Sequence, residues 1–217
     1  MRPLIKICGL KTQADVALCL RLGVDRLGFV AEYPRPVPWN LSRAEAAVLL
    51  AEANTLAPGR TCLVTSGAPA KVVALALLLR PAFVQLHGRE SAAETGAIAA
   101  ALRREGIGLI RTIFPDITDA ALRAYAASGA CALLLDPRAP EKAESGGAAD
   151  AALFRHVAGL TALPLILAGG ITAANVRGLL TATGAGQIDV LSGAESAPGV
   201  KDEEKIRALL RAARDWS

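Results

Sequence analysis

Two side chains capable of proton transfer stand where short apolar runs end, Cys8 near the N-terminus and Asp136 near the middle of the chain. A thiol becomes an effective base when a positive group or a helix terminus lies nearby. A carboxyl group between apolar walls can keep its proton near neutral pH and act as an acid. The two residues could therefore form an acid–base pair. An isolated cysteine is equally compatible with a buried small side chain, and an isolated aspartate with a loop cap, so position alone leaves both interpretations open.

Two glycine-containing segments near the C-terminus could bind a phosphate. Gly169 and Gly170 connect an apolar run directly to a predicted helix, and Ser192 and Gly193 follow the next apolar run. Glycine N–H groups can approach an anion closely, and a helix N-terminus adds positive partial charge. A plain tight turn is the alternative for either segment. Their occurrence in two successive loops favours a phosphate site.

Composition argues against several other classes of protein. Hydrophobic residues make up 53% of the 217, which is enough for a substantial core, and the formal net charge is +4. The basic residues are scattered along predicted helices without the interleaved aromatics of a nucleic-acid surface, so we expect a phosphate-bearing small molecule as partner and no nucleic acid. The four cysteines form no CxxC or Cys/His cluster, and neither a zinc site nor a redox pair is indicated.

The N-terminal segment lacks the apolar stretch of a signal peptide. Charged residues interrupt every apolar run before it reaches the length that spans a membrane. We therefore expect a cytoplasmic protein with reduced thiols and no membrane association.

A repeated unit of strand, loop and helix must position these side chains. Short apolar runs alternate with amphipathic segments along the chain, which is typical of parallel strands joined by crossover helices. The first run leads into Gly9 and Leu10 rather than the GxGxxG of an open dinucleotide-binding sheet. We predict an α/β fold, a single (β/α)8 TIM barrel domain over residues 1–217, with its functional groups at the carboxyl ends of the strands. The predicted strands are Leu4–Cys8, Arg26–Val30, Thr61–Val64, Phe83–His87, Gly108–Ile113, Ala132–Asp136, Leu165–Ala168 and Ile188–Leu191.

Helix starts and stops support this repeat. Three segments place a hydroxyl residue three positions before an acid, as in a capping box, and Thr172 is expected to cap the seventh helix. The capping boxes are Thr12 with Asp15, Ser42 with Glu45, and Ser91 with Glu94. Glycines close three helical stretches, at positions 23, 106 and 129.

Six motifs spread in order over most of the chain resemble those of the phosphoribosylanthranilate isomerases. They are KICGL at 6–10, LGFV at 27–30, VQLHG at 84–88 with Glu90, LLLD at 133–136, LAGGI at 167–171 with Asn175, and DVLSGAE at 189–195 followed by PGVKD at 198–202. Each motif is weak alone, whereas six in register are a strong signal.

The resemblance implies an enzyme of tryptophan biosynthesis that isomerises N-(5'-phosphoribosyl)anthranilate to 1-(2-carboxyphenylamino)-1-deoxyribulose 5-phosphate by an Amadori rearrangement. It implies that Cys8 is the general base and Asp136 the general acid. It also implies that no metal or redox cofactor takes part, because the protonated imine intermediate is itself the electron sink.

Two segments depart from the family pattern. Residues 31–42 read AEYPRPVPWNLS, where Arg35 is the counterpart of an arginine that meets the anthranilate carboxylate, a contact that a guanidinium can make with two hydrogen bonds. Trp39 in this loop could stack on the anthranilate ring or pack the loop down. After Asp136, the family's glycine-rich stretch is replaced by GGAA at 146–149, behind a charged loop at 138–144 that we expect to cover the site.

Three further residues have more than one interpretation. His87 ends the fourth strand, so we expect it to line the substrate pocket, with a satisfied rim histidine as the alternative. For Arg111, a structural pair with Asp136 or Glu90 is favoured over a place in the pocket. His156 falls on a predicted helix and is expected on the outer surface.

Two other functions stay open. Another phosphosugar isomerase or epimerase would share the phosphate loops, although metal-dependent epimerases need histidine ligands and the chain has two histidines. A non-catalytic barrel that binds a phosphorylated ligand would tolerate Cys8→Ser and Asp136→Asn. The sequence also leaves both a monomer and a homodimer open.

Overall fold

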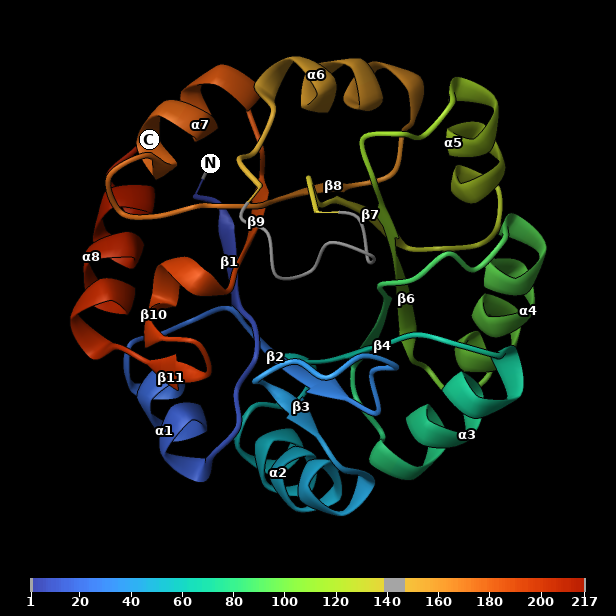
Figure 1. The fold of residues 1–217 in the computed structure, drawn as a ribbon, viewed down its shortest axis with the longest axis horizontal. Coiled ribbons are helices and arrows are strands. Elements are labelled where there is room, and N and C mark those ends of the chain that lie inside the picture. The colour runs from blue at the N-terminus through green and yellow to red at the C-terminus, as the bar shows by residue number, and fades with distance from the viewer. Residues whose placement is uncertain (1, 139–146, 217) are drawn as a thin grey trace.

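A closed ring of eight parallel strands forms the centre of the molecule, in a computed structural model that describes residues 2–138 and 147–216 (Figure 1). The barrel strands are β1 (Leu4–Ile7), β2 (Arg26–Ala31), β4 (Thr61–Thr65), β5 (Phe83–Leu86), β6 (Gly108–Ile113), β7 (Ala132–Leu135), β8 (Leu165–Ala168) and β9 (Gln187–Val190). Successive barrel strands pair with one another, and β1 pairs with both β2 and β9, which closes the ring. The predicted (β/α)8 barrel is confirmed.

Eight helices surround the ring, one after each barrel strand (Figure 1). They are α1 (Gln13–Arg21), α2 (Arg43–Leu56), α3 (Pro69–Leu79), α4 (Ala92–Arg103), α5 (Asp119–Ala126), α6 (Ala151–Leu160), α7 (Val176–Thr183) and α8 (Glu203–Arg214). The three predicted capping boxes are present at the starts of α1, α2 and α4. Gly23, Gly106 and Gly129 have positive φ after α1, α4 and α5, as expected of residues that end a helix.

Two apolar layers hold the barrel together. The larger layer lies between the strands and the helices, and includes residues such as Ile5, Leu27 and Leu63. A smaller cluster, with members on β4, β6, β7 and β8, fills the barrel interior. Side chains of a strand alternate between the two layers, so every second residue points into the barrel. This alternation decides which residues can reach a site at the barrel mouth.

The eight predicted strands agree with the observed ones to within one residue at each end. Three short strands were not predicted: β3 (Asn40–Leu41), which pairs with the end of β2, and the hairpin of β10 (Glu195–Ala197) and β11 (Val200–Lys201). The expectation that Thr172 caps the seventh helix is wrong. Helix α7 begins only after Asn175, whose side-chain oxygen accepts a hydrogen bond from the Thr172 N–H (2.8 Å).

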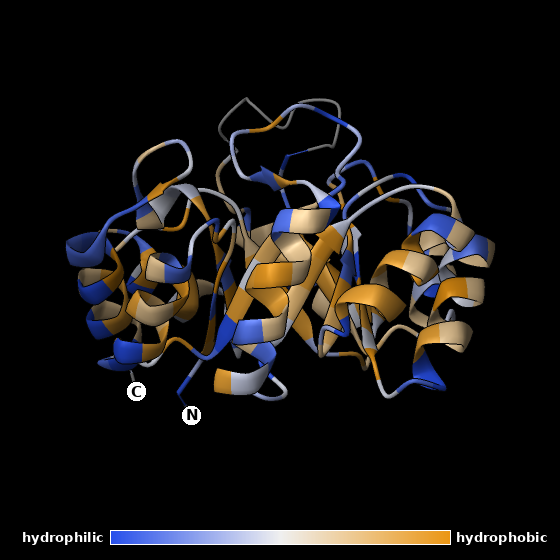
Figure 2. Cartoon of the chain, turned by 90° about the horizontal axis from the view of Figure 1, so that it is seen from below, coloured by the Kyte–Doolittle hydropathy of each residue, from blue (hydrophilic) through white to orange (hydrophobic). Residues whose placement is uncertain are grey.

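The two ends of the barrel differ in side view (Figure 2). Both termini lie at one end, and longer loops rise above the strands at the other, which is the carboxyl end of the strands. In the described part of the chain, no helix combines the length and apolar character needed to cross a membrane.

Candidate active site at the carboxyl ends of the strands

A pocket opens at the carboxyl end of the barrel, bordered by residues of seven barrel strands or of the loops that follow them. Its lining residues are Cys8, Val30, Tyr33, Val37, Trp39, Val64, Gln85, His87, Asp136, Arg138, Ala168, Gly169, Gly170, Ile171, Asp189, Leu191 and Ser192. Six of the eight site residues predicted from the sequence therefore border one pocket. The other two are Gly193, which directly follows Ser192, and Arg35.

Cys8 occupies one wall of the pocket, directly after β1. Its N–H donates to the Val190 carbonyl at the end of β9 (2.9 Å), and its side chain is 4% exposed. Gly28 of β2 leaves room for the sulfur, because a Cβ at that position would lie 3.1 Å from Sγ and 2.9 Å from the Cys8 Cα. The absence of a side chain at Gly28 thus allows the thiol to stand inside the barrel mouth.

Opposing charges act on this thiol. Burial raises the pKa of Cys8 above its ordinary value, and the Lys6 ammonium lowers it. The Asp189 carboxylate raises the pKa again, and Lys201 lowers it. Because the net shift is upward, the thiol of the free protein is protonated at neutral pH. Any role as a base therefore depends on the positive charge beside it.

Asp136 directly follows β7 and is held by its neighbour Arg138. The backbone N–H and Nε of Arg138 donate to Oδ1 at 2.9 and 3.2 Å, and a terminal nitrogen donates to Oδ2 at 3.2 Å. Burial disfavours the charged guanidinium, but the adjacent carboxylate raises the pKa of Arg138 overall. The two side chains form a nearly buried ion pair at the edge of the pocket. An acid role for Asp136 requires that one of its oxygens be released from this pair.

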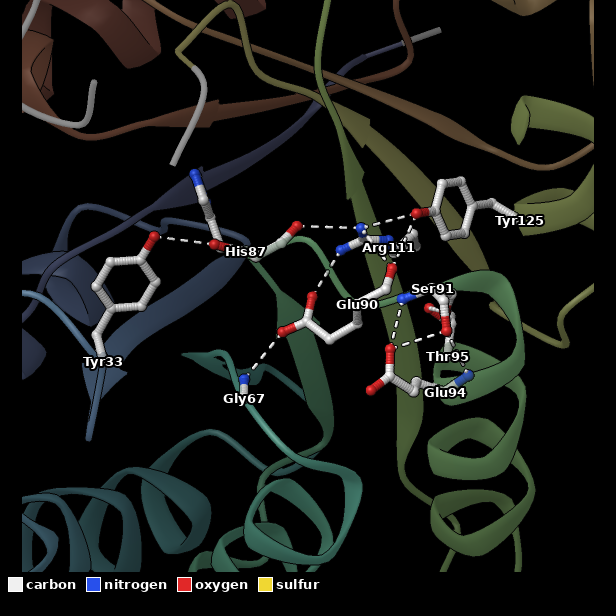
Figure 3. Close-up of polar contacts among 10 residues, drawn as sticks. Tyr33, Gly67, His87, Glu90, Ser91, Glu94, Thr95, Arg111 and Tyr125 are labelled. Carbon is white, nitrogen blue, oxygen red and sulfur yellow. Dashed lines mark hydrogen bonds and ion pairs between the residues drawn. The ribbon is translucent and has the colours of Figure 1, made fainter. Parts of the chain in front are cut away.

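His87 lies between Asp136 and the aromatic side of the pocket. Its Nε2 is 3.9 Å from Oδ2 of Asp136, and its ring stands edge-on to Tyr33 and near Phe114. The Tyr33 hydroxyl donates to the His87 carbonyl at 2.9 Å (Figure 3). Burial lowers the pKa of His87, and the Asp136 carboxylate only partly opposes this. At neutral pH the ring is therefore uncharged and can donate one hydrogen bond and accept another.

The two predicted phosphate loops need glycine for different reasons, a left-handed backbone in the first and a close backbone contact in the second. Gly169 and Gly170 have φ values of +99° and +58°, and a Cβ on Gly170 would lie 2.9 Å from the Gly147 carbonyl oxygen. At Gly193, in the 3-10 turn Ser192–Ala194, a Cβ would meet the Ile171 carbonyl oxygen at 1.9 Å. The two loops thus pack against each other backbone to backbone. This close approach leaves main-chain groups, rather than side chains, on that side of the pocket.

Arg111 does not line the pocket; it pairs with Glu90, one of the two partners expected for it (Figure 3). Its guanidinium donates to Oε2 of Glu90 (2.9 Å), to the carbonyls of Gly88 and Glu90 (3.0 Å each) and to the Tyr125 hydroxyl (3.3 Å). The other Glu90 oxygen accepts from the Gly67 N–H (2.9 Å). This network anchors the loop after β5, which carries His87. The structural interpretation of Arg111 is confirmed.

The remaining predicted residues lie apart from the centre of the pocket or outside the described residues. Arg35 is exposed on the loop after β2, and its contact with an anthranilate carboxylate stays a prediction. Trp39 of the same loop borders the pocket. His156 is exposed on α6, where it pairs with Asp119 (2.9 Å), as expected for the outer surface. The cover expected from the charged loop falls largely on residues 139–146, which are outside the described part.

Three polar residues of the pocket were missed by sequence reasoning: Gln85, Arg138 and Asp189. Gln85 and Asp189 are buried, and neither Gln85 Oε1 nor Asp189 Oδ1 has a hydrogen-bond partner in the structure as described. Unpaired buried acceptors are costly unless a ligand satisfies them. A signal was present in the sequence, because a polar residue at an inward position of an otherwise apolar barrel strand points to the site.

No three His, Cys, Asp or Glu side chains among residues 2–138 and 147–216 come together in a way that could hold a metal ion. The potential proton donors and acceptors of the pocket are instead single side chains on different strands, with Cys8 after β1, His87 after β5 and Asp136 after β7. Such an arrangement suits proton transfer at two separate positions of one small substrate.

Comparison with known proteins agrees with this geometry. Residues 5–212 match the family model described as N-(5'phosphoribosyl)anthranilate (PRA) isomerase. The N-(5'-phosphoribosyl)anthranilate isomerase of Bordetella petrii is 40% identical over 99% of this chain and 96% of its own length. Among solved structures, the phosphoribosyl anthranilate isomerase of Thermus thermophilus is 29% identical, with a TM-score of 0.80 over the full length of both chains. Another, a phosphoribosyl anthranilate isomerase in complex with reduced 1-(o-carboxyphenylamino)-1-deoxyribulose 5-phosphate, is 25% identical with a TM-score of 0.76, covering 99% and 100% of the two chains. The extent of these matches shows that this chain belongs to the phosphoribosylanthranilate isomerase family.

Proposed function

We propose that this protein isomerises N-(5'-phosphoribosyl)anthranilate to 1-(2-carboxyphenylamino)-1-deoxyribulose 5-phosphate, with Cys8 as general base and Asp136 as general acid. One observation carries the assignment of these roles. The thiol and the carboxyl group border the same pocket from β1 and β7, next to two loops whose backbone can bind a phosphate. A solved relative binds a reduced form of this product, which supports a ligand of the same kind here.

The reaction needs one proton donated and one removed at neighbouring positions of the sugar. Asp136 protonates the furanose ring oxygen, and the C1'–O bond breaks to give a protonated Schiff base. Cys8 then removes the proton from C2', and the electron pair moves into the C2'–C1' bond to form an enolamine. Tautomerisation of the enolamine to the ketone completes the rearrangement with no net change in protons or electrons. Each proton transfer of this kind contributes about 10²- to 10⁴-fold to a rate.

The glycine loops hold the 5'-phosphate in this proposal. Backbone N–H groups near Gly170 and Gly193 supply hydrogen bonds without bulk, and they lie near the start of α7 and the 3-10 turn that follows β9. Arg35 is the proposed contact of the anthranilate carboxylate, and the uncharged His87 ring donates a hydrogen bond to substrate within the pocket. The unpaired acceptors of Gln85 and Asp189 are available to sugar hydroxyl groups.

Reduced thiols are required for this chemistry. All four cysteines are free, and Cys8 serves as a base only in its reduced form. A reducing compartment such as the cytoplasm therefore suits the proposed activity. Each barrel contains a full set of the proposed groups, so the proposal holds for a monomer and for a homodimer alike.

The test compares Cys8→Ser and Asp136→Asn with the matched controls Cys131→Ser and Asp116→Asn. Both control residues lie outside the pocket lining, and Cys131 is exposed. Turnover of freshly prepared phosphoribosylanthranilate is followed by the change in anthranilate fluorescence. We expect a loss of kcat of at least about 10²-fold in each pocket variant, with product-analogue binding retained and the controls near wild type.

The outcome separates the remaining alternatives. Full turnover by both pocket variants removes Cys8 and Asp136 from the reaction. Binding of the phosphorylated ligand with no turnover by the wild-type protein favours a non-catalytic barrel. Turnover of a related phosphosugar, without turnover of the anthranilate substrate, favours another isomerase.

A further inference from the structure

Lys6 is a charged residue inside the barrel that the proposed reaction does not use directly. It lies on β1 two positions before Cys8, so both side chains point to the barrel interior. Lys6 is 3% exposed, and its Nζ donates to Oδ2 of Asp189 at 2.8 Å. The register of β1 and β9 places Lys6 directly opposite Asp189. The ion pair therefore sits in the layer immediately below the thiol.

Packing alone does not account for this pair. Burying two charges costs several kcal/mol per ion before their attraction repays it, and apolar residues of similar volume are often as stable. The second carboxylate oxygen, Oδ1 of Asp189, also lacks a partner in the described residues. A pair kept only for stability would be expected to satisfy both oxygens.

The gap left by Gly28 brings the lysine and the thiol together. A Cβ on Gly28 would lie 2.9 Å from Cε of Lys6 and 3.1 Å from Sγ of Cys8. The end of the lysine side chain and the sulfur are therefore neighbours across the same empty space. In this dry interior a charge acts on a neighbouring group much more strongly than it does in water.

We propose that Lys6 is a positioning residue for the reaction, whose buried ammonium stabilises the Cys8 thiolate, and that Asp189 sets how much of this charge the sulfur experiences. This inference rests on the proposed role of Cys8 as a base. When the thiol loses its proton, the resulting thiolate lies next to a permanent cation and is not an isolated buried anion. This thiolate then takes up the C2' proton and becomes a thiol again.

The groups around the thiol agree with this arrangement. Lys6 lies on the same strand, Asp189 on β9, Cys62 on β4, Lys201 on β11 and Arg138 after β7. Burial disfavours a charged Lys6, but the Asp189 carboxylate raises the pKa of Lys6 well above its ordinary value, so the ammonium persists at any pH of interest. Lys201 is already bound to Glu195 (2.5 Å). Lys6 is the larger of the two lysine influences that lower the pKa of Cys8.

The two members of the pair act on the thiol in opposite directions, which gives a test that a merely structural role would not pass. Lys6→Met removes the cation and raises the pKa of Cys8, whereas Asp189→Asn leaves the cation uncompensated and lowers it. The double variant Lys6→Met/Asp189→Asn contains no unpaired charge and keeps the fold if either single variant unfolds. In the double variant the pKa of Cys8 stays above the wild-type value, because burial of the thiol is then unopposed by Lys6.

The measurement is the rate of Cys8 alkylation by iodoacetamide as a function of pH in the full-length protein without substrate, located by peptide mass spectrometry. A neighbouring charge of this kind shifts a pKa by one unit or more, so Lys6→Met should react about tenfold more slowly than wild type at pH 7. Asp189→Asn should react faster. Wild-type and variant kcat/KM profiles are recorded over the same pH range, and their acidic limbs should move in the same directions.

The alkylation rates and the kcat/KM profiles together test the role of Lys6. If the pH dependence of Cys8 alkylation shifts in the same direction in both single variants, or in neither, the coupling of Lys6 to the thiol is overturned. If alkylation shifts in opposite directions in the two variants but their kcat/KM profiles do not move, the role of Lys6 in the reaction is overturned. Alkylation does not depend on turnover, so opposite shifts together with a fully active Cys8→Ser protein would contradict the proposed base while leaving the Lys6–Cys8 coupling established.

Discussion

Two of the buried ion pairs in the described residues have almost equal length, Lys6–Asp189 at 2.8 Å and Arg111–Glu90 at 2.9 Å, and they differ in how completely their carboxylates are satisfied. Arg111 donates to a carboxylate, two backbone carbonyls and a hydroxyl, and its guanidinium stacks 4.5 Å above the Tyr125 ring (Figure 3). Both Glu90 oxygens have partners, and Nε of Arg111 is the one buried polar side-chain atom of this pair without a partner in the described residues. In the other pair, Asp189 uses one oxygen and leaves the second unpaired at the pocket.

The difference suggests two roles: the Arg111–Glu90 pair holds loops in place, whereas the Lys6–Asp189 pair acts on the neighbouring Cys8 thiol. The Arg111–Glu90 pair makes its other hydrogen bonds to the backbone of the loops after β4 and β5 and to the Tyr125 hydroxyl. It lies outside the pocket lining. The Lys6–Asp189 pair borders a thiol and has hydrogen-bonding capacity left for a ligand. A buried carboxylate is therefore a better guide to the site when one of its oxygens lacks a partner than when both have one.

The largest expected effect comes from breaking the Arg111–Glu90 pair. Arg111→Met leaves Glu90 buried without its cation, so the free energy of unfolding should fall by about 3–5 kcal/mol. The Tyr125 stacking and the anchor on the loop after β5 are lost as well. Urea unfolding followed by circular dichroism measures the change.

The control for this prediction is Arg111→Met/Glu90→Gln, which removes both charges and should recover part of the lost stability. The acidic limb of the kcat/KM profile of the folded fraction should stay where it is in wild type. A shift of that limb comparable to the one expected for Lys6→Met would show that the two pairs do not differ in function.

A medium effect is expected at Gly28, the glycine that lets the lysine and the thiol meet. A methyl group there would lie 2.9 Å from Cε of Lys6 and from Cα of Cys8, closer than side chains tolerate. Gly28→Ala should cost about 1–3 kcal/mol by overpacking and should also displace the thiol, lowering kcat/KM. Unfolding and steady-state kinetics measure the two parts.

Gly96 on α4 provides the matched control, since the nearest atom to a Cβ there is 3.6 Å away. Gly96→Ala should stabilise the protein by about 0.5–1 kcal/mol, because it lowers the entropy cost of ordering the helix. Equal activity and equal stability of the two variants would mean that the missing side chain at Gly28 is not needed for the close approach of Lys6 and Cys8.

The sequence predicted the barrel well because its strands are buried on both faces. Such strands read as short apolar runs, so their ends were located to within one residue. Short elements without a period, such as β3 and the β10–β11 hairpin, carry no such signal. Thr172 has the hydroxyl group typical of a helix cap, whereas the turn built around Asn175 delays the start of α7.

Pairings between distant residues could not be predicted in the same way. Lys6 and Asp189 are 183 positions apart, and only the register of β1 against β9 brings them together. The sequence identified Cys8 and Asp136 as residues that could transfer protons, but not the charges that control them. The fork of Arg138 on Asp136 likewise depends on the loop conformation after β7.

The smallest expected effect concerns His87, which connects the Arg111–Glu90 network with the pocket. Its loop is anchored by Arg111 through the Gly88 carbonyl, while its ring faces the pocket.

Burial lowers the pKa of His87 below the value of about 6.5 in the unfolded chain. As the pH falls through 6.5, the unfolded chain therefore binds a proton first. The stability contributed by the neutral ring is present above pH 6.5 and is lost as the pH drops towards the folded pKa. His87→Gln should therefore lose less stability than wild type between pH 7.5 and 5.0, as measured by urea unfolding at the two pH values. Tyr33→Phe removes the hydrogen bond to the His87 carbonyl and should instead cost about 1 kcal/mol of stability at both pH values. An identical pH dependence of stability in wild type and His87→Gln would contradict a buried neutral ring.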